Sequence, residues 1–228
     1  MLVLLAAPAW GAQPPPRSPD AAKVLDERIA DARRAVEASP DDAAARVALA
    51  KLLHYKAGRG DDKARREAYK LWEQLQKANP DDPVAAAYRG SSVLQSAPHA
   101  WAPWKKGELA KQGVVMLNEA VEAAPDDLEV RLIRGLSTAK LPADFGLAEQ
   151  SQADVAAVAA MAPEAADEHG TLSPDLAAAA LYAHGVNRLI ADDPAAAAEL
   201  WRTAVTRWPD SPAARDADHA LHLTGDGE

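Results

Sequence analysis

The feature that most constrains this chain is a short turn sequence that returns along its length. The stretch at 38–42, Ala-Ser-Pro-Asp-Asp, recurs at 78–82 and 124–127, and more loosely around Pro209, Pro163 and Pro174. Proline stops a helix because it lacks an N–H group, and Asp or Ser caps the helix that follows. Successive prolines of these turns lie 40, 45, 38, 11 and 35 residues apart. Such intervals are typical of helix-hairpin repeats.

The residues between the turns predict helices throughout. They are rich in alanine, the best helix former, and contain no alternating run of β-branched residues. The formal net charge of −9 argues against nucleic acid as a partner, because phosphate binding needs a dense basic face. The chain has no cysteine, so it has no disulfide, thiolate metal site or lipid-modified cysteine. The sequence therefore predicts an all-α protein.

The first residues differ from everything that follows. Residues 1–12 combine a short apolar core with small residues up to Ala12, as a secretory signal peptide does, although no Lys or Arg precedes the core. The alternative is a frayed apolar N-terminus on a cytosolic protein. Residues 13–19 are proline-rich and predict a stiff linker. No later run approaches the roughly 20 apolar residues of a membrane span, so we expect a periplasmic or secreted bacterial protein without a transmembrane span.

One helical domain is expected over residues 20–224. Apolar residues at helical spacing between the turns place its helices at 20–38, 42–57, 63–78, 83–97, 104–124, 128–139, 147–161, 174–191, 194–208 and 212–223. An acidic connection is expected at 163–171.

The spacing of small and bulky residues resembles that of tetratricopeptide repeats. The second helix of that repeat carries Ala, a bulky residue, a small residue and Pro at fixed offsets, as in Ala68-Trp72-Leu75-Pro80 and Ala197-Trp201-Ala204-Pro209. Two weaker matches begin at Gly113 and Ser151, and the small residue of the first helix falls on Ala50, Gly90 and Gly135. The resemblance implies a right-handed stack of about four irregular hairpins, with an N-terminal helix and a C-terminal capping helix. Trp72 and Trp201 would be buried between hairpins.

The resemblance also implies a groove lined by the first helix of each hairpin. The candidate ligand or partner positions in this chain are mostly aliphatic, with few polar or cationic members: Val47, Lys51, His54, Val84, Ser91, Leu94, Leu132, Leu136, Leu181 and Arg188. Such a surface suits an apolar ligand with one polar end, or an amphipathic partner helix. Alternatively, neighbouring helices cover these positions and they form the core.

A second candidate surface is the loop at 97–104. Trp101 and Trp104 lie beside two prolines there and predict a rigid aromatic edge. Rigid aromatic side chains mark interfaces because they bury a large area at low entropic cost. The alternative is a flap that closes over the helix at 42–57.

The sequence offers little support for catalysis or metal binding. The paired Asp residues follow helix-stopping prolines, so capping explains them better than calcium binding or acid–base catalysis. His219 and His222 could touch one ion, but two ligands without a third make a weak metal site. No nucleophile elbow, P-loop or dinucleotide fingerprint occurs. We expect no enzyme activity, no cofactor and no metal.

At the level of architecture, the chain resembles exported bacterial repeat proteins that accompany periplasmic solute or sterol transport systems. This resemblance implies a non-enzymatic adaptor that binds a protein partner in the cell envelope. The alternative is a carrier that encloses a hydrophobic molecule, such as a lipid or sterol, between its helices. The lining of the groove separates the two functions: segment binders need polar hydrogen-bonding rows, whereas a lipid carrier needs a closed aliphatic pocket.

Overall fold

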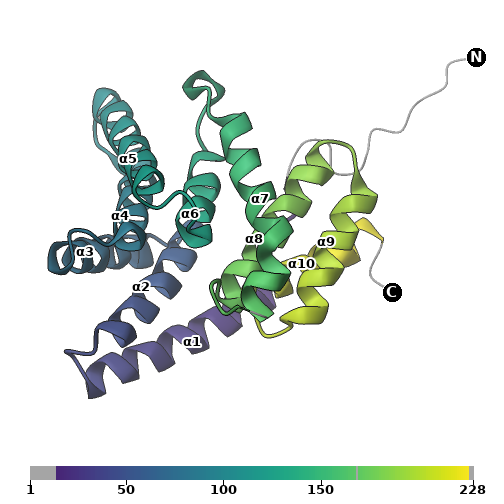
Figure 1. Ribbon diagram of the computed structural model, residues 1–228, viewed down its shortest axis with the longest axis horizontal. Coiled ribbons are helices and arrows are strands. Elements are labelled where there is room, and N and C mark those ends of the chain that lie inside the picture. The colour runs from purple at the N-terminus through teal and green to yellow at the C-terminus, as the bar shows by residue number, and fades with distance from the viewer. Residues whose placement is uncertain (1–13, 168, 226–228) are drawn as a thin grey trace, which may run out of the picture. The chain divides into compact units, whose positions relative to one another are not determined.

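Ten α-helices follow one another along the part of the chain that the computed structural model describes, residues 14–167 and 169–225, and that part contains no strand (Figure 1). The signal peptide predicted at 1–12 lies outside these residues. None of the described helices combines the length and apolar character needed to cross a membrane. The helices are α1 (Pro19–Ala38), α2 (Ala43–Gly58), α3 (Asp62–Ala78), α4 (Pro83–Ser96), α5 (Pro103–Ala123), α6 (Leu128–Thr138), α7 (Ala148–Asp167), α8 (Pro174–Ile190), α9 (Pro194–Arg207) and α10 (Pro212–Thr224). Two short 3₁₀ helices, Ala97–His99 and Ala143–Phe145, lie in loops.

The recurring turns cap helices as the sequence predicts. In the first three copies the second aspartate is the N-cap: Asp42, Asp82 and Asp127 accept hydrogen bonds from main-chain N–H groups of α2, α4 and α6. These groups have no partner within the helix itself, so each carboxylate satisfies donors that would otherwise be left unpaired. The Pro-Asp-Asp turn therefore ends one helix and starts the next.

The two aspartates of a turn are expected to differ in their effect on stability. Asp82→Ala should lower the free energy of unfolding by about 1 kcal/mol, because it removes the acceptor for the N–H groups of Val84 and Ala85. Asp81→Ala is the matched control, since Asp81 is exposed and does not cap α4. Urea unfolding of both variants measures the difference, and equal losses would contradict the capping role.

One predicted helix end is wrong. The sequence predicts a helix that stops near Met161 because of the proline at 163, but α7 continues through Pro163 to Asp167 and includes most of the predicted acidic connection. A proline inside a helix costs one main-chain hydrogen bond and roughly 3 kcal/mol. Ala162 and Ala165 are buried on either side of it, and we attribute the continued helix to this packing.

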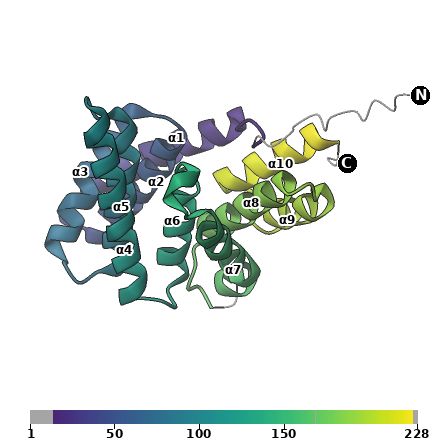
Figure 2. The same ribbon diagram turned by 90° about the horizontal axis from the view of Figure 1, so that it is seen from above.

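The chain divides into two compact units. The central unit is Ala22–Val158, and the terminal unit combines residues up to Ala21 with residues from Ala159 onwards. In the central unit α2 pairs with α3 and α4 with α5, while α6 packs against α4 and α5 (Figure 2). In the terminal unit α8, α9 and α10 pack together. The hairpins predicted from the turns are thus present in each unit.

Aromatic rings form the core of the central unit. Trp72 of α3 is 1% exposed and stacks on Tyr88 of α4, with ring centroids 4.3 Å apart and an angle of 5° between the planes. His54 of α2 meets the same Tyr88 ring edge-on at 5.0 Å. One ring from each of three helices therefore fixes how α2, α3 and α4 pack.

Trp201 has the corresponding position in the terminal unit. It is fully buried, and its Nε1 donates a hydrogen bond to the main-chain oxygen of Tyr182 at 3.1 Å. The indole lies over Gly185 of α8, where a Cβ would collide with the ring at Nε1. A glycine at 185 therefore lets α8 and α9 approach closely. The predicted burial of both Trp72 and Trp201 is confirmed.

The predicted linker packs against the terminal unit. Pro15 and Ser18 are buried, and Asp216 of α10, itself fully buried, accepts from Ser18 N at 2.8 Å and from Arg17 Nη1 at 3.0 Å. The Arg17 guanidinium also lies over the Tyr182 ring, 4.8 Å from its centroid. Arg17 and Ser18, just before α1, are thus fastened to the last helix.

Candidate functional site

The predicted groove residues fall into both units. Leu181 and Arg188 belong to α8 of the terminal unit, where Leu181 is buried and Arg188 is exposed and ion-paired with Asp193. The other eight lie in the central unit, on α2, α4 and α6. Five of the ten are buried, namely His54, Ser91, Leu94, Leu132 and Leu181, whereas Val47, Lys51, Val84 and Leu136 are half-buried.

An ion pair and a hydrogen bond connect α2, α4 and α6, the first helices of their hairpins. The ammonium group of Lys51 on α2 lies 2.7 Å from Oε1 of Glu129 on α6, and the Tyr88 hydroxyl on α4 donates to the same oxygen at 2.8 Å. Burial raises the pKa of Tyr88 well above its usual value, and the charge of Glu129 acts in the same direction. Tyr88 therefore remains a neutral donor. The side chain of Lys51 is 32% exposed and that of Glu129 is 13% exposed, so part of this ion pair reaches the surface.

One helical turn further along α2, a second polar set surrounds His54. Its Nε2 lies 3.0 Å from Ser91 Oγ and 3.1 Å from the Gln95 amide nitrogen, and Ser92 Oγ lies 3.4 Å from Nδ1. The Gln95 amide nitrogen donates to Nε2 in the tautomer that carries the ring proton on Nδ1. Ser91 Oγ also forms a hydrogen bond with Ser137 Oγ of α6, at 2.6 Å. A row of hydrogen bonds therefore crosses from α2 through α4 to α6.

The buried imidazole makes stability depend on pH. Burial lowers the pKa of His54 from 6.5 to about 3, and the charge of Lys140 acts in the same direction. A lowered pKa means that the unfolded chain binds this proton more readily, so stability is complete above pH 6.5 and falls as the pH drops toward about 3. We expect a loss on the order of 1 kcal/mol per pH unit in this range. Unfolding of the wild type and of His54→Gln at several pH values isolates the contribution, and parallel pH profiles would contradict it.

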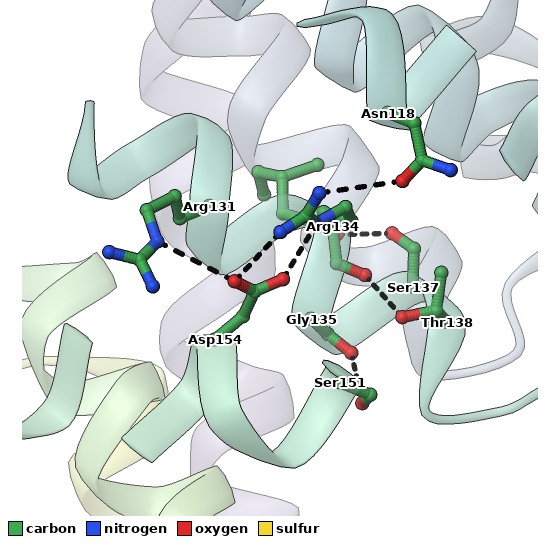
Figure 3. Close-up of polar contacts among 9 residues, drawn as sticks. Asn118, Arg131, Arg134, Gly135, Ser137, Thr138, Ser151 and Asp154 are labelled. Atoms are coloured by element: carbon green, nitrogen blue, oxygen red, sulfur yellow. Dashed lines mark hydrogen bonds and ion pairs between the residues drawn. The ribbon is translucent and has the colours of Figure 1, made fainter. Parts of the chain in front are cut away.

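A third polar cluster fastens α6 to its neighbours. Asp154 of α7 is 2% exposed and receives Arg134 Nε at 2.7 Å and Nη2 at 3.0 Å, with Arg131 Nε at 3.5 Å (Figure 3). Arg134 Nη1 also reaches Asn118 of α5 at 3.4 Å. Ser151 Oγ donates to the main-chain oxygen of Gly135 at 2.8 Å, where the two helices lie close together. The cluster holds α5, α6 and the start of α7 in place and presents no nucleophile beside a base.

The predicted aromatic edge is exposed. Trp101 is 84% exposed and Trp104 is 68% exposed, and their rings meet edge to face with centroids 5.3 Å apart. The loop therefore does not bury its tryptophans as the flap over α2 would require. His219 and His222, which the sequence offers only as a weak metal site, both lie on α10, where His222 Nδ1 is 3.8 Å from Asp218 Oδ1. Among the described residues, no three His, Cys, Asp or Glu side chains gather as metal ligands would.

Sequence reasoning misses the partners of Lys51 and His54. It places neither Tyr88 nor Gln95 at the groove, and it does not select Glu129 although the repeat position of Glu129 is one that lines the groove. The available signal is charge: Lys51 and Glu129 are opposite charges at groove positions of different hairpins. Their contact spans 78 residues, and no local pattern reports such a pairing.

The sequence matches no protein-family profile and no curated protein. The structure is similar to the crystal structure of a thermophilic tetratricopeptide-repeat protein from Thermus thermophilus, with a TM-score of 0.57 and 17% sequence identity. The likeness covers 91% of this chain and 92% of that chain. Together with the all-helical architecture, it shows that the fold is tetratricopeptide-repeat-like.

Proposed function

We propose that this tetratricopeptide-repeat-like chain is a non-enzymatic adaptor that binds a segment of a partner protein on the faces of α2, α4 and α6. The observation that carries the proposal is the polar edge that reaches the surface of those helices: Lys51, 32% exposed and paired with Glu129, together with the half-buried Gln95 and Ser137. Hydrogen-bonding rows suit a polypeptide segment, whose main chain and side chains both offer donors and acceptors. Lys51 and Glu129 largely neutralise each other, so they would bind the segment through hydrogen bonds to its polar groups rather than through a net charge.

A carrier for a lipid or sterol receives less support from the same residues. Leu94 is 7% exposed and Leu132 is fully buried, and their burial is by protein atoms. Leu94 belongs to the same buried cluster as Trp72. The aliphatic side chains thus contribute to the core, whereas Lys51 and the half-buried Gln95 and Ser137 offer polar groups at the surface.

Crosslinking in the native host tests the proposal. A photoreactive residue in place of Val47, one turn before Lys51 on α2, should crosslink to a protein that the same group in place of the exposed Lys77 of α3 does not reach. With that protein purified, Lys51→Gln should weaken binding about tenfold and Lys77→Gln should not. If native mass spectrometry of the host-purified chain instead finds a bound lipid or sterol, and no protein crosslinks, the carrier replaces the adaptor.

The adaptor is further proposed to act in the cell envelope after export. The support is the leader-like pattern of residues 1–12. Protein recovered from the periplasm of its bacterial host should begin near Gln13, as intact mass and N-terminal sequencing would report. An intact Met1 on protein found in the cytosol would remove the envelope partner from the proposal and leave the binding face unaffected.

A further inference from the structure

The outer face of α5 carries apolar side chains that no other part of the described chain covers. Trp104 in its first turn is 68% exposed, Val115 two turns before its end is 53% exposed, and Trp101 just before the helix is 84% exposed. Residues spaced by seven and four along a helix share one face, so Trp104, Lys111 and Val115 form a single stripe. Such an exposed apolar stripe is removed from water only when a binding partner covers it.

The charges on this stripe are ordered along the helix. Lys111 lies toward the N-terminal half of α5, and Glu119 and Glu122 lie in the C-terminal half, all three exposed. None of them has an ion-pair partner within the described residues, whereas Glu108 is neutralised by Lys105 at 2.9 Å. The stripe therefore runs from a positive part to a negative part, with Val115 between them.

The geometry points to a second copy of this chain as the occupant, with the two α5 helices packed antiparallel about a two-fold axis near Val115. In that arrangement Lys111 of each copy lies opposite Glu119 of the other, since both are four residues from Val115. Glu122 lies opposite Glu108, which Lys105 of its own copy pairs at 2.9 Å. Trp104 of each copy reaches the turn after α5 of the other, where Pro125 is exposed. A two-fold contact uses the same patch on both copies, and a patch with its opposite charges at its two ends is complementary to itself.

The area and the charge pattern favour this occupant over others. A tryptophan buries about 150–250 Å², so Trp101 and Trp104 of two copies would supply about 600–1,000 Å² of the roughly 1,200 Å² that a small stable interface needs. An anionic membrane surface would attract Lys111 but repel Glu119 and Glu122. A second copy places Lys111 against Glu119 twice, once on each side of the two-fold axis. The inference uses a different surface from the proposed adaptor face and does not depend on it.

Sedimentation equilibrium of the full chain over a wide range of concentrations tests the inference. The wild type should form a dimer, and Lys111→Glu should weaken it about tenfold, because each dimer loses two attractions and gains two repulsions. Adding Glu119→Lys to that variant should restore the dimer. Trp104→Ala should weaken it as well, and Lys77→Glu on α3 is the matched charge control that should leave it unchanged.

All substituted side chains are exposed, so each variant is expected to keep the helical circular-dichroism spectrum of the wild type. Three results would each overturn the inference. The wild type could remain monomeric at every concentration, the dimer could ignore Lys111→Glu, or the charge exchange with Glu119→Lys could fail to restore association. Crosslinking at the α2 face is a separate readout, so failure here leaves the adaptor proposal untouched.

Discussion

Trp201→Ala is expected to lower the free energy of unfolding by about 3–5 kcal/mol. The indole is fully buried where α8 and α9 meet, and its removal leaves a cavity against Gly185. The Tyr182 carbonyl oxygen would also lose the hydrogen bond from the ring nitrogen. Guanidinium unfolding followed by circular dichroism measures the loss.

The same substitution at an exposed tryptophan provides the control. At concentrations too low for the dimer proposed above, Trp101→Ala removes only a ring that is 84% exposed, and surface substitutions usually change stability by less than about 0.5 kcal/mol. A Trp201→Ala variant as stable as Trp101→Ala would mean that Trp201 does not hold α8 and α9 together.

Gly113→Ala is expected to cost about 2–3 kcal/mol, although alanine is the better helix former. The added Cβ would lie 2.9 Å from the main-chain oxygen of Gly90 and 2.9 Å from the main-chain nitrogen of Leu94. These are backbone atoms of α4 and cannot rotate away as a side chain can. The variant must therefore force α4 and α5 apart, and its thermal unfolding should begin at a lower temperature.

Gly107 of the same helix is the matched control. A Cβ at this position has no heavy atom of a neighbouring element within 4 Å. Gly107→Ala should therefore raise stability by about 0.5–1 kcal/mol through helix propensity alone. If both glycine substitutions stabilise the chain, the close crossing of α4 and α5 at Gly113 is refuted.

Much of the fold is predictable because its signals are local. A turn such as 78–82 contains its own helix stop and its own cap, so the limits of α3 and α4 are predicted to within one residue. The small residues at Gly90 and Gly113 mark a helix crossing by their spacing alone. Pro163 breaks the pattern, since its effect depends on how the alanines around it pack, and a local rule contains no such information.

The candidate site is less predictable because its contacts are not local. The positions of Lys51 and His54 on the face of α2 follow from counting along the repeat. Their partners depend on how far α2, α4 and α6 are shifted along one another. The loops between these helices differ in length, and they determine that shift. The expectation of an aliphatic groove fails for a related reason. Leu132 belongs to the core, whereas the polar Ser137 of the same helix remains half-buried.

The fastening of Arg17 and Ser18 to Asp216 has a consequence for how the chain acquires its structure. The two ends of the contact are 199 and 198 residues apart, so the terminal unit cannot close until nearly the whole polypeptide has been synthesised. The central unit is continuous in sequence and rich in contacts that can form early. Long-range closure is slow because the entropy of a large loop is lost before any contact forms. The last step of folding would then join Arg17 and Ser18 to the final helix, and a chain truncated before α10 would lose the carboxylate that holds them.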